Sequence, residues 1–214
     1  MLRLKERHNN QGSYVNFLKL PENFMTSKEK NSTEAPLWLR AWRTQKENLQ
    51  LVVLALCLAL LIRTFVAEPR YIPSDSMLPT LEMGDRLVVE KISSRFRPPV
   101  TGDIVVFGPP QQLQILGYAK DQAFIKRIIG EPGQIVSVAN GKVYVNSEPL
   151  QEDYIAEPPA YDWGPQRVPN EEFFVMGDNR NDSNDSHIWG FLPKQNIIGR
   201  ARFRFWPLNR SGFV

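Results

Sequence analysis

The pattern of apolar and polar positions divides the chain into a polar N-terminal arm, one long apolar run and a region of short alternating segments. Residues 51–62 read LVVLALCLALLI without a polar interruption. Extended to residues 49–66, the run has polar side chains only near its ends, where long ones can reach the lipid headgroups. A helix of this length rises about 27 Å, roughly the hydrocarbon thickness of a bilayer. The pattern predicts a transmembrane helix over residues 49–66, although a buried helix of a soluble domain can look similar.

The residues that flank the apolar run predict its orientation. Nine Lys or Arg residues lie within residues 1–48, whereas Arg63 and Arg70 follow closely behind the run. By the positive-inside rule, residues 1–48 form a cytoplasmic tail, largely disordered, and residues 67–214 lie outside. No small-x-small cleavage site follows the run, so we expect an anchor rather than a cleaved leader.

Beyond residue 67 the chain contains short apolar runs, rich in β-branched residues and bounded by turn residues, which is typical of β-strands. We expect strands in residues 86–92, 102–108, 124–130, 171–178 and 197–207. Residues 134–150 predict a hairpin, because Asn140–Gly141 lies between two alternating segments. Residues 151–170, rich in Pro and acidic side chains, predict an irregular excursion. The fold class is therefore mostly β, an antiparallel sheet or barrel-like domain tethered by one N-terminal helix.

Composition narrows the function classes. The single cysteine, Cys57, excludes an internal disulfide, and with only His8 and His187 the chain has no ligand set for a Cys/His zinc site. The net charge of +3 is too small to indicate a nucleic-acid partner. The last strand carries a basic stripe, for which a solvated strand face is the ordinary explanation: Arg200, Arg202 and Arg204.

Two serines follow the apolar run within YIPSDSMLPTLEMGD, residues 71–85. A serine hydroxyl is a poor nucleophile until a base takes its proton. Lys126 could be that base, because burial against apolar groups lowers a lysine pKa, although a snorkelling strand lysine is the alternative. Its sequence neighbours are apolar: Phe124, Ile125, Ile128 and Ile129.

A third polar stretch, GDNRNDSNDSHIWGFLP at residues 177–193, leaves other chemistry open. Asp185 and His187 could complete a Ser-His-Asp triad, although no G-x-S-x-G elbow surrounds either serine. A calcium loop from Asp182 would lack both its Gly and its final Glu, and Pro193 stands where that Glu belongs. The pattern alone is equally typical of a solvated loop of Asx turns.

Taken together, these stretches resemble the type I signal peptidases, which are membrane-anchored Ser/Lys endopeptidases. The resemblance covers roughly residues 49–206, and four motifs occur in the family's order. They are IPSDSMLPTL (72–81), GDRLVVEK (84–91), KRIIGEPG (126–133) and GDNRNDSNDS (177–186).

The resemblance implies roles for individual residues. Ser76 would be the nucleophile and Lys126 the general base, while Ser74 would assist the oxyanion hole and Ser183 would orient the lysine amine. The positions of the family's supporting ion pairs are occupied by Arg127, Asp178 and Asp185. The positions that line its apolar substrate pockets are occupied by Ile72, Pro73, Met77, Leu81, Phe124 and Ile125.

The implied reaction is cleavage of signal peptides from exported preproteins through an acyl-enzyme, without a metal or cofactor and without nucleic acid. The implied location is the cell membrane, or a thylakoid membrane where one exists, with the lipid bilayer as a partner and the chain as a monomer. Two residues depart from the family pattern: Asp75 stands where glycine is common, and His187 stands where arginine often pairs with Asp185. The alternatives are another Ser/Lys processing peptidase, of the pilin-conjugation or self-cleaving repressor type, and a catalytically idle peptide-binding β domain.

Overall fold

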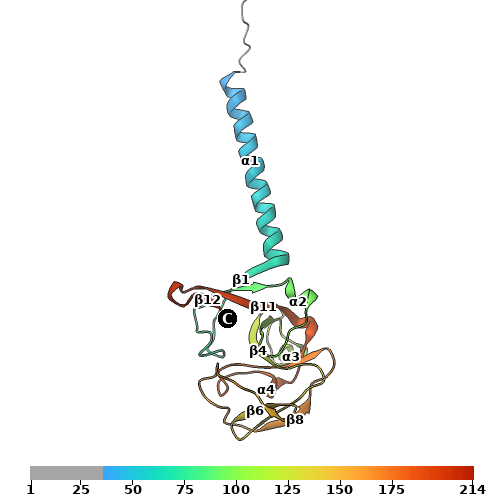
Figure 1. Ribbon diagram of the computed structural model, residues 1–214. Coiled ribbons are helices and arrows are strands. Elements are labelled where there is room, and N and C mark those ends of the chain that lie inside the picture. Colours follow the sequence, from blue (N-terminus) through green and yellow to red (C-terminus); the bar gives the residue numbers. More distant parts are fainter. Residues whose placement is uncertain (1–35) are drawn as a thin grey trace, which may run out of the picture. The chain divides into compact units, whose positions relative to one another are not determined.

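The computed structural model describes residues 36–214, so residues 1–35 of the predicted disordered tail (residues 1–48) lie outside the described part. The rest of that tail, from Leu37 onward, is helical rather than disordered. Helix α1 (Leu37–Leu61) continues into a π-helical turn, η1 (Ile62–Val66) (Figure 1). Within them, Asn48–Val66 has a mean hydropathy of 2.4 and none of its residues is buried. By length and composition this stretch could cross a membrane, and it coincides with the predicted segment apart from one residue at its start.

The larger of two β-sheets contains the residues that matter for chemistry. Its hydrogen-bonded order is β1-β2-β11-β3-β4-β9-β10, with β12 paired to β11, and all neighbours are antiparallel. The strands are β1 (Ala67–Tyr71), β2 (Arg86–Glu90), β3 (Ile104–Phe107), β4 (Phe124–Gly130), β9 (Glu172–Met176), β10 (Leu192–Pro193), β11 (Ile197–Trp206) and β12 (Gly212–Phe213).

A smaller antiparallel sheet has the order β7-β6-β5-β8. Its strands are β5 (Ile135–Ala139), β6 (Lys142–Val145), β7 (Glu148–Pro149) and β8 (Trp163–Arg167). Short helical turns connect the strands of the two sheets: α2 (Ser93–Phe96), α3 (Gln111–Ile115), α4 (Ser186–Trp189), η2 (Lys194–Asn196) and η3 (Leu208–Arg210).

The predicted fold class and strands are confirmed. The hairpin of β5 and β6 turns at Asn140 and Gly141, whose φ angles of 51° and 71° are those that a two-residue hairpin turn of this kind requires. The excursion at residues 151–170 is irregular except for β8, which pairs with β5. The pattern did not predict β1, because AEPRY contains a proline and no alternation.

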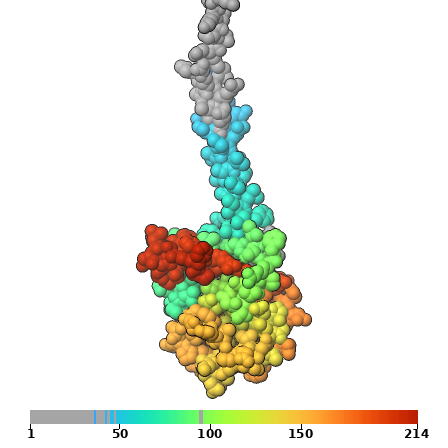
Figure 2. Space-filling view, viewed as in Figure 1, coloured from blue at the N-terminus to red at the C-terminus, as the bar shows by residue number. Residues whose placement is uncertain are grey.

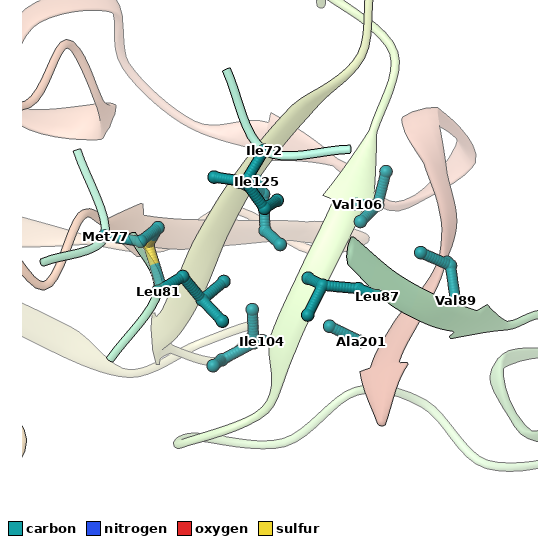
Figure 3. Close-up of a cluster of buried hydrophobic side chains, with 9 residues drawn as sticks. All are labelled: Ile72, Met77, Leu81, Leu87, Val89, Ile104, Val106, Ile125 and Ala201. Atoms are coloured by element: carbon teal, nitrogen blue, oxygen red, sulfur yellow. The ribbon is translucent and has the colours of Figure 1, made fainter. Parts of the chain in front are cut away.

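The apolar faces of the strands pack into three buried clusters. One lies beneath the serine loop and brings together β2, β3, β4 and β11 with the residues that follow β1 (Figure 3). Its members are Ile72, Met77, Leu81, Leu87, Val89, Ile104, Val106, Ile125 and Ala201.

The basic stripe of β11 is not a fully solvated face, because Arg200 is buried and Arg202 and Arg204 are half-buried. Arg200 is 1% exposed, its Nε lies 3.1 Å from Asp103 Oδ2, and it donates a hydrogen bond to the backbone oxygen of Arg97. Arg204 donates to the backbone oxygen of Thr80. Arg200 and Arg204 therefore hold neighbouring parts of the fold together, and the predicted solvated face is wrong for Arg200. The C-terminal residues beyond β11, dark red in Figure 2, include the strongly exposed Leu208 and Phe213.

Candidate active site

The two serines lie on the loop that connects β1 to β2. Hydrogen bonds from Ile72 N to the Asp85 oxygen and from Gly84 N to the Ile72 oxygen, each 2.9 Å, close the base of this loop. Met77 and Leu81 are fully buried in the cluster of Figure 3 and anchor the turn from its apolar side. The loop is therefore fixed by its core contacts, which give the serine beside Met77 a defined position.

Lys126 and Ser76 meet at hydrogen-bonding distance: Lys126 Nζ lies 2.6 Å from Ser76 Oγ. The lysine occupies the middle of β4, which pairs with β3 on one side and β9 on the other, so its backbone is rigid. Lys126 is only 4% exposed. Burial lowers the pKa of its amine from 10.5 to about 8, against the opposing attraction of Asp185 and Asp178. Near neutral pH a fraction of this lysine is uncharged and able to accept a proton.

Two further serines flank the pair. Ser74 Oγ lies 3.4 Å from Ser76 Oγ. The Ser183 hydroxyl is buried and has no hydrogen-bond partner in the described structure, so its predicted contact with the lysine amine stays a prediction. Ser183 nevertheless lies close to the Ser76 backbone. A Cβ placed on Gly177 would lie 2.3 Å from both Ser183 Oγ and the Ser76 carbonyl oxygen. Only glycine fits at this position, and its absent side chain lets Ser183 approach the Ser76 backbone.

Arg127, the neighbour of the lysine, is held by Asp178. Its Nε and Nη2 donate to the two carboxylate oxygens at 2.8 and 2.6 Å, which is a bidentate pair. Thr80 Oγ1 donates to the same carboxylate at 2.6 Å, so the serine loop is tied to this pair. Asp178 is completely buried. The predicted ion pair thus connects three elements: β4, the serine loop and the segment after β9.

The Asp185 carboxylate interacts with three nitrogen atoms. It accepts from Gly177 N at 2.9 Å and from His187 N at 3.2 Å, and His187 Nδ1 lies 2.7 Å from its Oδ1. The ring of His187 stacks on Tyr161 with 4.2 Å between centroids. The histidine therefore occupies the pairing position at which the family often has arginine.

Sequence reasoning missed two residues that position the site: Asn179, which holds the serine loop, and Arg180, which holds Gly177. Asn179 donates its backbone N–H to the Ser76 oxygen at 3.2 Å and its amide to the Asp75 oxygen at 3.2 Å. Arg180, which is 1% exposed, donates from Nε to the Gly177 oxygen at 3.0 Å. Both belong to the GDNR motif, so the motif match pointed to them, but no periodicity indicated their partners.

A cavity of about 390 Å³ opens beside the serine–lysine pair. Among the predicted pocket residues, Pro73, Phe124 and Ile125 line it, whereas Ile72, Met77 and Leu81 lie in the buried cluster below the loop. Its remaining lining residues are Ser74, Ser76, Tyr118, Gln122, Ala123 and Lys126. The cavity therefore presents an apolar and aromatic wall next to the reactive hydroxyl. Within residues 36–214, no group of three or more His, Cys, Asp or Glu side chains is placed to hold a metal ion.

A hydroxyl held against a buried lysine on an antiparallel sheet is the arrangement of a Ser/Lys peptidase. The profile of the family described as "Signal peptidase, peptidase S26" matches residues 45–206. The chain belongs to this family, and it is a signal peptidase I type of serine peptidase.

Relatives in several organisms support this assignment. The chain is 66% identical over 171 residues to "Probable signal peptidase I-1" of Synechocystis, covering 80% of this chain and 87% of that protein. It is 58% identical to "Signal peptidase I" of Leptolyngbya laminosa, covering 78% and 82% of the two chains. It is also 48% identical to "Probable thylakoidal processing peptidase 2, chloroplastic" of Arabidopsis thaliana, covering 75% of this chain and 44% of that protein.

Proposed function

We propose that this peptidase removes signal peptides from exported preproteins by acyl transfer to Ser76, with Lys126 as the general base. The observation that carries the proposal is the 2.6 Å contact between Lys126 Nζ and Ser76 Oγ at a lysine that is 4% exposed. The uncharged amine takes the hydroxyl proton as Oγ attacks the scissile carbonyl. The same amine then delivers the proton to the leaving nitrogen and later activates the water that releases the signal peptide.

The developing oxyanion needs hydrogen-bond donors on the other side of the carbonyl. The Ser76 backbone N–H and the Ser74 hydroxyl are our candidates, because the two hydroxyl oxygens are 3.4 Å apart. Ser183 is assigned to orienting the lysine amine. Its hydroxyl is buried and without a hydrogen-bond partner in the described structure, and it faces Gly177 together with the Ser76 carbonyl oxygen, which supports this assignment.

The cavity beside Ser76 is proposed to take the small side chains that precede the cut. Its volume of about 390 Å³ and its wall of Pro73, Phe124 and Ile125 suit a short apolar segment in extended conformation. Ile72, Met77 and Leu81 support this wall from beneath, as part of the packed core.

The membrane placement is likewise a proposal. Helix residues 49–66 would span the bilayer with residues 1–48 in the cytoplasm, and the serine loop begins six residues after Val66 (72 − 66). This short connection would place the site close to the membrane surface, where a signal peptide leaves the bilayer. Protease protection of the folded domain in intact cells tests the orientation.

The catalytic assignment is tested by cleavage of a preprotein by the full chain in lipid vesicles. Ser76→Ala and Lys126→Ala should each abolish cleavage, while His187→Ala should retain it. A dead His187→Ala variant beside an active Lys126→Ala variant would instead establish the Ser-His-Asp alternative. Cleavage by Ser76→Ala would exclude both mechanisms.

A further inference from the structure

The segment that connects β7 to β8 runs along the loop that carries Ser183 and touches it repeatedly. We call residues 152–161 the strap and residues 177–187 the catalytic loop. Asn181 of the catalytic loop donates its amide to the Pro158 oxygen at 3.1 Å and accepts from Ala160 N at 2.8 Å. At the far end of the strap, Tyr161 stacks on His187. The strap therefore follows the catalytic loop over most of its length.

The first contact between the strap and the catalytic loop is a buried ion pair. Arg180 Nη2 donates to Glu152 Oε1 at 2.6 Å, and the two side chains are 0% and 7% exposed. Burial alone would lower the pKa of Arg180, but the Glu152 carboxylate raises it, so the guanidinium stays charged. Arg180 Nε in turn donates to the Gly177 oxygen at 3.0 Å. A carboxylate on the strap thus fixes the residue against which Ser76 and Ser183 both pack.

The second strap contact holds the other arginine of the site. The Tyr154 ring lies under the Arg127 guanidinium, with 4.0 Å from Cζ to the ring centroid, and Tyr154 Oη donates to Glu152 at 3.0 Å. Arg127 is already bound on its edge by Asp178, so the aromatic face covers the side of the guanidinium that the carboxylate leaves open. Glu152 and Tyr154 therefore act as one unit on two cations.

We propose that Glu152 and Tyr154 are positioning residues of the catalytic site: they hold Arg180 and Arg127 so that the catalytic loop keeps Ser183 and the Ser76 carbonyl in register with Lys126. This inference rests on the proposed Ser76–Lys126 mechanism. It assigns to the smaller sheet a part in catalysis, because the strap connects two of its strands. The strap does not line the cavity beside Ser76, so its loosening should affect turnover more than substrate binding.

The test is steady-state cleavage of a preprotein by full-length variants in vesicles, with the folded fraction of each measured. Glu152→Gln leaves Arg180 without its counter-charge, and its matched control is Glu157→Gln on the exposed part of the same strap. Tyr154→Leu removes the aromatic face, whereas Tyr154→Phe keeps it. A misplacement of about 1 Å is enough to slow a reaction about 100-fold, so we expect kcat to fall about 10- to 100-fold in Glu152→Gln and Tyr154→Leu, with KM changed less than about twofold.

The pH profile separates positioning from mere stability. Water entering behind a loosened strap would raise the pKa of Lys126 toward its ordinary value, and the rising limb of kcat would move to higher pH. Glu157→Gln should keep the wild-type limb and activity. Tyr154→Phe keeps the aromatic face but loses the hydrogen bond to Glu152, so its kcat and its limb should lie between those of the wild type and those of Tyr154→Leu. If folded Glu152→Gln and Tyr154→Leu enzymes keep the wild-type kcat and limb, the strap has no positioning role. A parallel Ser76→Ala sample that still cleaves would overturn the proposed mechanism itself, which is a different result.

Discussion

Replacing the proposed catalytic lysine should make the protein more stable at neutral pH. The pKa of Lys126 falls from 10.5 to about 8 on burial. At about 1.36 kcal/mol per pKa unit, holding this charged amine in the folded state below pH 8 costs about 3 kcal/mol. Lys126→Met removes the charge while an unbranched side chain keeps the space filled. The variant also loses the hydrogen bond to Ser76, worth about 1 kcal/mol, so its net gain in the free energy of unfolding should be about 2 kcal/mol at pH 7.

The sign of the pH dependence follows from proton binding. Between pH about 8 and 10.5 the unfolded chain binds more protons at this lysine than the folded chain, so the stability of the natural protein rises with pH across this window. The penalty that is complete at pH 7 should fall below about 1 kcal/mol at pH 10. The advantage of Lys126→Met should therefore shrink by about 2.5 kcal/mol between pH 7 and pH 10, and the lost hydrogen bond cancels in this difference.

Chemical denaturation of the full chain in detergent micelles, followed by tryptophan fluorescence at pH 7 and pH 10, measures both quantities. The matched control is Lys142→Met on β6, because that lysine is exposed. It should change the free energy of unfolding little, and equally at the two pH values. A Lys126→Met protein that is less stable than the natural one at pH 7, or whose difference does not depend on pH, would refute the idea of a desolvated lysine.

Three further substitutions test individual contacts. Gly177→Ala should lower kcat at least about 100-fold, because its Cβ would lie 2.3 Å from two atoms of the site, whereas Gly108→Ala, with nothing within 4 Å, should cleave normally. Arg127→Ala leaves a fully buried carboxylate unpaired and should lower the free energy of unfolding by about 3–5 kcal/mol in the same denaturation assay. Asp185→Asn removes an attraction that raises the pKa of Lys126, so the rising limb of the pH–rate profile should move to lower pH.

The strands were predictable because each is a short apolar run, rich in β-branched or aromatic residues and bounded by turn residues. The run around Lys126 is the clearest case: every residue of β4 after Phe124 is buried, and its apolar neighbours in sequence identify a lysine in an unusual environment. The turn at Asn140–Gly141 was equally local, since the backbone conformation depends on these two residues.

The wider site could not be found from local pattern, because its contacts join residues far apart in the chain. Ser76 and Lys126 are fifty positions apart (126 − 76), and only the motif order connected them. Glu152 and Tyr154 lie in an irregular segment whose proline-rich composition predicts a loop and nothing about its partners. The buried state of Arg200 was missed because Asp103, its counter-charge, lies 97 positions earlier in the chain (200 − 103), directly before β3, the strand that pairs with β11.

The pH dependence of kcat/KM for preprotein cleavage by the full chain in vesicles tests the central claim most directly. If a desolvated Lys126 is the base, activity should rise with a single apparent pKa of about 8. The rising limb of the pH profile should move to lower pH in Asp185→Asn, and it should remain in His187→Ala. An activity that is flat between pH 7 and pH 9.5, or a rising limb that His187→Ala abolishes, would contradict the account.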